Sequence, residues 1–127
     1  MNTFRCALVA TALAAPLALA APAHASGGTA VVNRSSCVGG GIFTLKAKHD
    51  DARVIEVEYE VDTNRAGQVW SVRLLHDGVT IFSGPATTVA PSGSFTVRRT
   101  TGNWSGTDVI TSRATRGAQV CGGRVAL

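Results

Sequence analysis

Two histidine–aspartate neighbours are the first residues to test for chemistry. His49 precedes Asp50 and Asp51, and His76 precedes Asp77. A serine hydrolase needs a histidine base that a carboxylate orients. The Asp-Gly step at Asp77 is a hairpin signal, so turn chemistry explains that aspartate. His49 falls in a predicted surface turn, and the chain has no nucleophile elbow. We therefore expect no catalytic residue and a protein that is not an enzyme.

The segment from His49 to Asp51 also offers donors of the kind that bind metals. Adjacent residues on one turn rarely converge on a single ion, and structural zinc sites use four ligands. No loop has the ligand spacing of a calcium site. We therefore expect no metal site and no cofactor.

Four carboxylates follow one another along a predicted strand, at Glu56, Glu58, Glu60 and Asp62. They alternate with apolar residues, so they share one face. Glycosidases place their carboxylate pair across a cleft, not along one strand. We expect a solvated face with cross-strand ion pairs to Arg73, Arg98 and Arg113, each worth about 0–1 kcal/mol. A functional role for the row stays open.

Trp104 is the candidate contact residue, together with its neighbour Asn103. It lies in a polar loop, where an exposed tryptophan suits contact with a protein partner or a sugar ring. The alternative is a ring that folds back over the open end of the domain. Trp70, in contrast, alternates with Val72 and Leu74 and is expected in the core.

The first 25 residues have the pattern of a secretory signal peptide. One charged side chain, Arg5, precedes an Ala- and Leu-rich run, and small residues precede a cut after Ala25. Ala23 offers a second possible cut. The run is too short and too rich in alanine for a membrane anchor, which needs about 20 strongly apolar residues. The expected protein is secreted and extracellular.

The remaining residues, 26–127, form one predicted domain. Cleavage after Ala25 removes 25 residues, Arg5 among them, from a chain of 127 residues with net charge +4. It leaves 102 residues with net charge +3. The basic residues are scattered, which argues against nucleic-acid binding. No later segment is apolar enough to span a membrane. The expected partner is an extracellular protein or a cell-wall component.

Cys37 and Cys121 are the two cysteines left after cleavage. In an oxidising compartment such a pair is most simply a disulfide. It would tie the early part of the domain to its last strand. Closing so long a loop gives up to about 4–5 kcal/mol in the chain-entropy model.

Short alternating runs separated by turn residues predict seven or eight strands and an all-β domain. Their number and spacing indicate an immunoglobulin-like β-sandwich with Greek-key connections. The predicted strands cover residues 29–33, 42–48, 53–62, 68–76, 79–82, 94–100, 107–115 and 119–127.

Strand pairing can also be anticipated. We expect 53–62 and 68–76 to be antiparallel neighbours, which would bury Tyr59 and Trp70 together and place Glu58 and Arg73 on one wet face. A two-residue turn after His76 puts Leu74 opposite Ile81. The segment 84–93 is long for a hairpin loop, so we expect it to cross from one sheet to the other.

Three stretches together carry a resemblance: residues 55–70, with Ile-Glu-Val-Glu-Tyr-Glu-Val-Asp at their start; residues 90–99, with Ala-Pro-Ser-Gly-Ser-Phe; and Cys-Gly-Gly-Arg at 121–124. The chain resembles a group of small exported actinobacterial proteins of unknown function. The resemblance implies the compartment, the cysteine pair and the β-sandwich. It implies no activity.

The sequence therefore predicts a secreted, non-enzymatic binding domain. An extracellular enzyme inhibitor is the first alternative, with the segments 84–93 and 101–106 as its protruding loops. A carbohydrate-binding module is less favoured, because such modules carry rows of exposed aromatic side chains and this chain has one Tyr and two Trp.

Overall fold

A computed structural model describes residues 28–127, which form eight strands and no helix. The predicted signal peptide, with its cleavage sites at Ala23 and Ala25, lies outside the described residues. No described segment is a helix long and apolar enough to cross a membrane. The strands are β1 (Val31–Ser36), β2 (Ile42–His49), β3 (Val54–Asp62), β4 (Val69–His76), β5 (Val79–Thr87), β6 (Ser94–Gly102), β7 (Val109–Arg116) and β8 (Gln119–Ala126).

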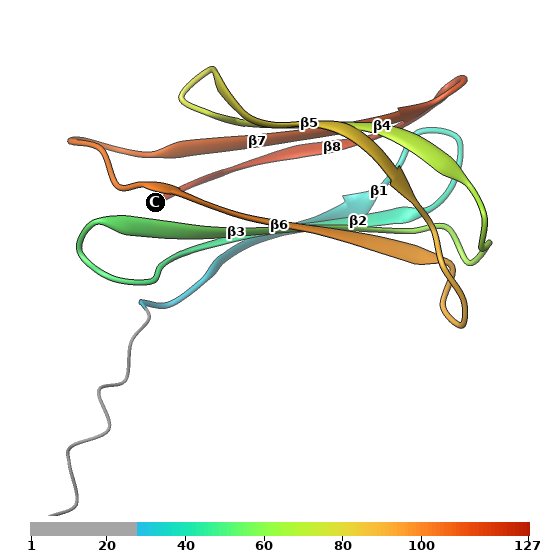
Figure 1. The fold of residues 1–127 in the computed structure, drawn as a ribbon, viewed down its shortest axis with the longest axis horizontal. Coiled ribbons are helices and arrows are strands. Elements are labelled where there is room, and N and C mark those ends of the chain that lie inside the picture. Colours follow the sequence, from blue (N-terminus) through green and yellow to red (C-terminus); the bar gives the residue numbers. More distant parts are fainter. Residues whose placement is uncertain (1–27) are drawn as a thin grey trace, which may run out of the picture.

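The strands form two antiparallel sheets that face each other (Figure 1). The first sheet has the order β1-β2-β3-β6 and the second the order β5-β4-β7-β8. The chain passes from one sheet to the other after β3, β5 and β6. The prediction of an all-β sandwich is confirmed. The crossover after β5 is also present, but it is shorter than expected, because β5 continues to Thr87.

The core lies between the inner faces of the two sheets. Along β3 and β4 every second side chain is buried, as period-two alternation requires. Aromatic rings bridge the layers: the rings of Tyr59 in β3 and Trp70 in β4 both lie close to Phe95 of β6, at centroid distances of 6.3 and 6.5 Å. The predicted joint burial of Tyr59 and Trp70 is confirmed, and Val57 and Val72 are buried with them.

The predicted pairing of β3 with β4 is wrong. β3 pairs with β2 and β6, and β4 pairs with β5 and β7, so the two strands belong to opposite sheets. Strands in facing sheets bury their inner faces in the same core, as neighbouring strands do, so alternation gives both arrangements the same signature. In consequence Arg73 does not share a face with Glu58.

The register of the β4–β5 hairpin also differs from its prediction. The turn is the expected one, with positive φ at Asp77 (46°) and Gly78 (81°). Beyond it a β-bulge adds one residue to β5 at Ile81, so Leu74 lies opposite Phe82 instead. A bulge cannot be read from the turn residues, because it belongs to the ladder beyond them.

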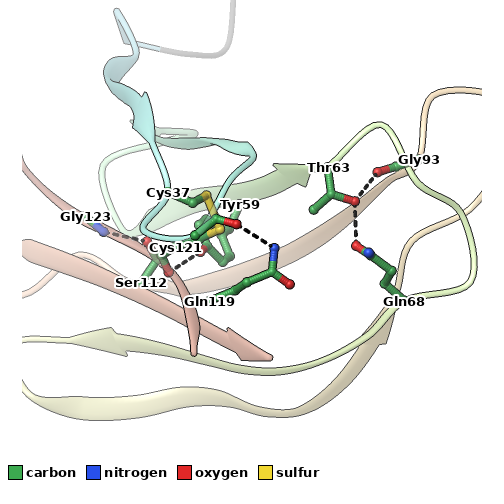
Figure 2. Close-up of a disulfide and its surroundings, with 10 residues drawn as sticks. Cys37, Tyr59, Thr63, Gln68, Gly93, Ser112, Gln119, Cys121 and Gly123 are labelled. Atoms are coloured by element: carbon green, nitrogen blue, oxygen red, sulfur yellow. Dashed lines mark hydrogen bonds between the residues drawn. A yellow bond between two sulfur atoms is a disulfide. The ribbon is translucent and has the colours of Figure 1, made fainter. Parts of the chain in front are cut away.

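The Cys37–Cys121 disulfide is present and joins the loop between β1 and β2 to β8 (Figure 2). The two Cα atoms are 4.4 Å apart. Beside it Val38 and Val120 exchange two backbone hydrogen bonds of 2.8 and 3.0 Å. The hydroxyl of Tyr59 donates to the carbonyl of Cys121 at 2.8 Å. Burial raises the pKa of this hydroxyl, so it remains a donor.

Trp70→Ala should lower the free energy of unfolding by about 3–5 kcal/mol, because it removes a fully buried indole and leaves a cavity. Val69→Ala, at an exposed position on the same strand, is the control and should change it by less than about 0.5 kcal/mol. Urea denaturation measures both. Near-normal stability of the Trp70 variant would contradict the position of this ring in the core.

Candidate functional site

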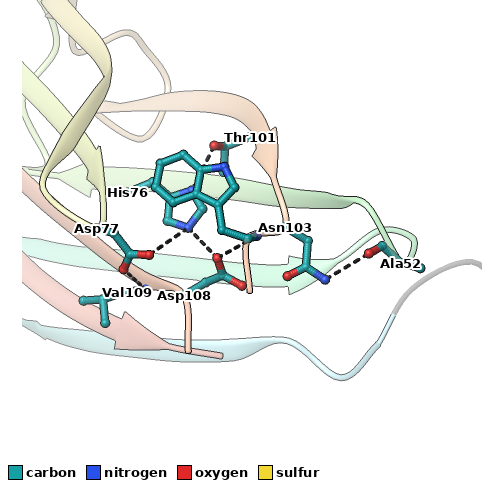
Figure 3. Close-up of polar contacts among 8 residues, drawn as sticks. Ala52, His76, Asp77, Thr101, Asn103, Asp108 and Val109 are labelled. Carbon is teal, nitrogen blue, oxygen red and sulfur yellow. Dashed lines mark hydrogen bonds and ion pairs between the residues drawn. The ribbon is translucent and has the colours of Figure 1, made fainter. Parts of the chain in front are cut away.

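One end of the sandwich is closed by polar side chains from three parts of the chain (Figure 3). His76 is the last residue of β4, Thr101 lies near the end of β6, and Asp108 directly precedes β7. The loop between β6 and β7 carries Trp104 across this end. Each polar residue continues an inward-facing alternation of its strand, so the fold directs these side chains into the space between the sheets.

His76 is fully buried and both of its ring nitrogens have partners. Nδ1 lies 3.0 Å from Thr101 Oγ1, and Nε2 lies 2.6 Å from Asp108 Oδ1. An ionised carboxylate only accepts hydrogen bonds, so Nε2 donates to Asp108. Asp77 is the more distant carboxylate, with its Oδ2 3.6 Å from Nε2.

Asp108 is nearly as buried as the histidine, at 1% exposure. Its Oδ1 also accepts a hydrogen bond from the backbone nitrogen of Trp104 at 3.2 Å. Its Oδ2 is buried and has no hydrogen-bond partner among residues 28–127. One carboxylate oxygen therefore fixes both the imidazole and the start of the tryptophan loop.

Trp104 stacks on His76, with ring centroids 3.8 Å apart and planes 10° from parallel. The ring thus folds back over the end of the sandwich, as one of the two expectations had it. It nevertheless remains 41% exposed. The two alternatives are therefore not exclusive, because one part of the ring covers the histidine and another faces solvent.

Asn103, the other predicted contact residue, holds this loop to the turn between β2 and β3. Its side-chain amide donates to the carbonyl of Ala52 at 3.0 Å, and its backbone nitrogen donates to the carbonyl of Arg53 at 2.7 Å. Its amide group is thus committed to an internal contact, and Trp104 is the residue of the pair that presents free surface.

The chain of contacts from Thr101 through His76 to Asp108 has the residue types of a hydrolase triad. A triad must meet its substrate, whereas this imidazole has no exposed surface and lies beneath an indole. The polar network is better suited to holding Trp104 than to proton transfer with a substrate.

His76, Asp77 and Asp108 also offer three ligand atoms within 4.8 Å of one another. Those carboxylates already accept hydrogen bonds: Asp108 Oδ1 from two donors, and the Asp77 carboxylate from the backbone nitrogen of Val109 at 2.8 Å. These hydrogen bonds explain the positions of the two carboxylates, while Asp108 Oδ2 has no partner within the described residues.

Sequence reasoning missed Thr101 and Asp108 as partners of His76, since Asp77 stood next to it. A usable signal did exist. His76 continues the inward-facing alternation of Trp70, Val72 and Leu74. Asp108 lies two residues before Ile110, so it points inward as Ile110 does. A polar residue at an inward position needs a buried partner.

The acidic row lies on the outer face of the first sheet, as expected. Glu58 is held between Lys46 of β2 and Arg98 of β6, at 3.3 and 2.8 Å. Glu56 pairs with Lys48 at 3.1 Å. The predicted pairing with Arg98 is confirmed. The predicted pairings with Arg73 and Arg113 are wrong, because both arginines lie on the other sheet.

The hydrogen bond from Arg98 holds the pKa of Glu58 below its ordinary value of 4.5; burial opposes this effect, and Lys46 adds to it. A carboxyl group with a lowered pKa in the folded state stabilises the fold above its unfolded pKa. That stabilisation is lost as the pH falls through the folded value.

Glu58→Gln should therefore cost less than about 1 kcal/mol at neutral pH, and the difference from wild type should shrink as the pH falls below 4.5. Urea denaturation across this pH range measures the effect. Glu60→Gln is the matched control, from the same face but without an ion pair in the described residues, and should show no such trend. A gap that widens in acid would contradict the assignment.

Asp108→Ala should lower the free energy of unfolding by about 1–3 kcal/mol, because it leaves His76 Nε2 and the Trp104 nitrogen without their acceptor. It should also alter the near-ultraviolet circular dichroism of Trp104. Asp50→Ala, at a carboxylate that makes no side-chain hydrogen bond within the described residues, is the control and should do neither. An unchanged dichroism signal in the Asp108 variant would show that this carboxylate does not order the loop.

Comparison of the chain with protein-family models, with curated proteins and with solved structures finds no match. The role of this end of the sandwich is therefore inferred from its own contacts, burial and charges.

Proposed function

We propose that the protein is a secreted, non-enzymatic binding domain that contacts its partner through Trp104. The observation that carries this proposal is an indole stacked on a buried histidine and still 41% exposed. An aromatic ring held at such a surface supplies a large apolar contact area, of the kind that dominates binding energies.

The fixed position of the ring supports this role. Its backbone is bonded to Asp108, and the preceding residue is bonded to the turn between β2 and β3. A partner therefore meets a side chain that has already lost its conformational freedom, which lowers the entropic cost of association. A free surface loop would not give that advantage.

The partner is an extracellular protein or a cell-wall component. The Cys37–Cys121 bridge supports an oxidising compartment, where such bonds persist. It agrees with export directed by residues 1–25. The lack of any solvent access to His76 supports a role without catalysis.

We also propose that the sandwich is immunoglobulin-like, with β1 as an added strand. The order β5-β4-β7-β8 corresponds to C′-C-F-G of that fold, and β2-β3-β6 to A-B-E. Trp70 then occupies strand C, where immunoglobulin domains bury a tryptophan. The disulfide departs from that pattern, because it starts in the β1–β2 loop.

The test compares the retention of wild-type protein and Trp104→Ala on immobilised cell-wall material and on proteins of the culture supernatant. We expect at least a tenfold loss of retention, since aromatic contact residues commonly contribute more than about 1.4 kcal/mol. Val89→Ala, at another exposed apolar residue, is the control and should bind normally. Thermal unfolding of each variant checks that the fold is intact.

Trp104→Tyr separates contact from folding, because it keeps an aromatic ring over His76. It should regain part of the binding lost in Trp104→Ala. Full binding by both variants, each folded, would overturn Trp104 as the contact residue. Retention on wall material alone would assign the partner to the wall, and recovery of one defined protein would assign it to that protein.

A further inference from the structure

The outer faces of the two sheets differ in whether their charged side chains form ion pairs. On the first sheet, Glu56 and Glu58 are paired with basic residues of neighbouring strands. On the second sheet, Arg73 of β4 and Arg113 of β7 are direct cross-strand partners. Side chains opposite each other in an antiparallel pair project to the same side, so two like charges stand together there.

Neither arginine forms an ion pair within residues 28–127. Arg73 has one long contact, 3.4 Å from its Nη2 to Thr80 Oγ1, and both side chains are exposed. Like charges directly opposite one another destabilise a sheet. The other sheet pairs its charges across strands, whereas this arginine pair has no acidic partner within residues 28–127.

The surface around the pair is hollowed and rich in hydroxyl groups. Arg73 and Arg113 line a depression of about 400 Å³ together with Ser71, Ser83, Pro85 and Thr115. A second depression of about 440 Å³ lies on the other side of Arg113 and is bordered by Gly122 and Gly123. No aspartate or glutamate lines either one.

Small residues keep the guanidinium groups uncovered. Ser83 flanks Arg73 on β5, and Gly122 flanks Arg113 on β8. A side chain at Gly122 would meet the backbone oxygen of Ser112 at 2.6 Å, so no larger residue fits there without a shift. The two depressions share Arg113 as a lining residue, and we refer to them together as the groove.

We propose that this groove binds an acidic extracellular polysaccharide, with a carboxylate of the polymer held between Arg73 and Arg113. Guanidinium groups match the planar fork of a carboxylate. The hydroxyl groups of Ser71, Ser83 and Thr115 suit the sugar hydroxyls on either side, and Pro85 gives an apolar edge for a ring. This site goes beyond the contact through Trp104 and rests on different residues.

The probe is a short galacturonate oligosaccharide, with a neutral glucose oligosaccharide of the same length, poly-glutamate and inorganic phosphate as comparison ligands. Isothermal titration measures each with the secreted protein. We expect the acidic oligosaccharide to bind most tightly and its affinity to fall as salt is added, since charge drives the contact. Arg113→Gln and Arg73→Gln should each weaken it at least tenfold.

Arg65→Gln, which removes the same charge from the exposed turn between β3 and β4, is the matched control and should change affinity less than twofold. The two groove variants should also melt at the wild-type temperature or above it, because each removes a repulsive pair. Trp104→Ala should retain this binding if the groove acts alone, so the failure of either proposal can be recognised separately.

Equal binding of the neutral oligosaccharide, or equal weakening by Arg65→Gln, would overturn the proposed site. Tighter binding of poly-glutamate would overturn the polysaccharide in favour of an acidic protein segment. Binding of phosphate alone, or of none of the ligands, would leave the groove without its proposed occupant and also overturn the proposal.

Discussion

The covalent bond between Cys37 and Cys121 is the constraint that holds the two sheets together at one end of the sandwich. Backbone ladders stabilise each sheet internally, but the two layers meet mainly through packed side chains. The bridge joins the β1–β2 loop of one sheet to β8 of the other, across a sequence separation of 84 residues. Its entropic contribution of about 4–5 kcal/mol is comparable with the whole stability of a small domain, about 5–15 kcal/mol. Reduction of the bridge should therefore remove a large part of the stability of the domain.

The opposite end of the sandwich is closed by a different kind of interaction. β3 runs from one end to the other. It ends near the disulfide, and its first residue pairs with Gly102, close to Trp104. Small apolar side chains would cover that end at a lower cost in free energy, because buried polar groups destabilise a fold unless they form hydrogen bonds. The chain instead buries His76 with Asp108, and one oxygen of that carboxylate has no partner in the described part of the chain. What this arrangement achieves is a fixed, partly exposed indole.

Much of the fold could be predicted because its signals are local. Alternation in β3 and β4 located the core, the Asp77 turn located a hairpin, and two cysteines defined the bridge. Partner strands, the bulge at Ile81 and the contact between His76 and Asp108 could not be predicted in the same way. These features depend on which segments lie side by side in space. His76 and Asp108 are 32 positions apart, and the sequence indicates only that both side chains point inward. The arginine pair was missed for the same reason.

The two surface features are related through the strands that carry them. Arg73 lies three residues before His76 on β4, and a strand rises about 3.4 Å per residue, so the groove begins about 10 Å from the end that Trp104 covers. On the β7 side the spacing is longer, since Arg113 follows Asp108 by five residues, or about 17 Å. The contact between His76 and Asp108 and the pair of arginines therefore both lie along β4 and the start of β7. An extended polymer could reach both features, whereas a compact ligand would occupy one. Because β4 and β7 are paired along this stretch, the spacing between the arginines and His76, the residue on which Trp104 stacks, is set by the sheet.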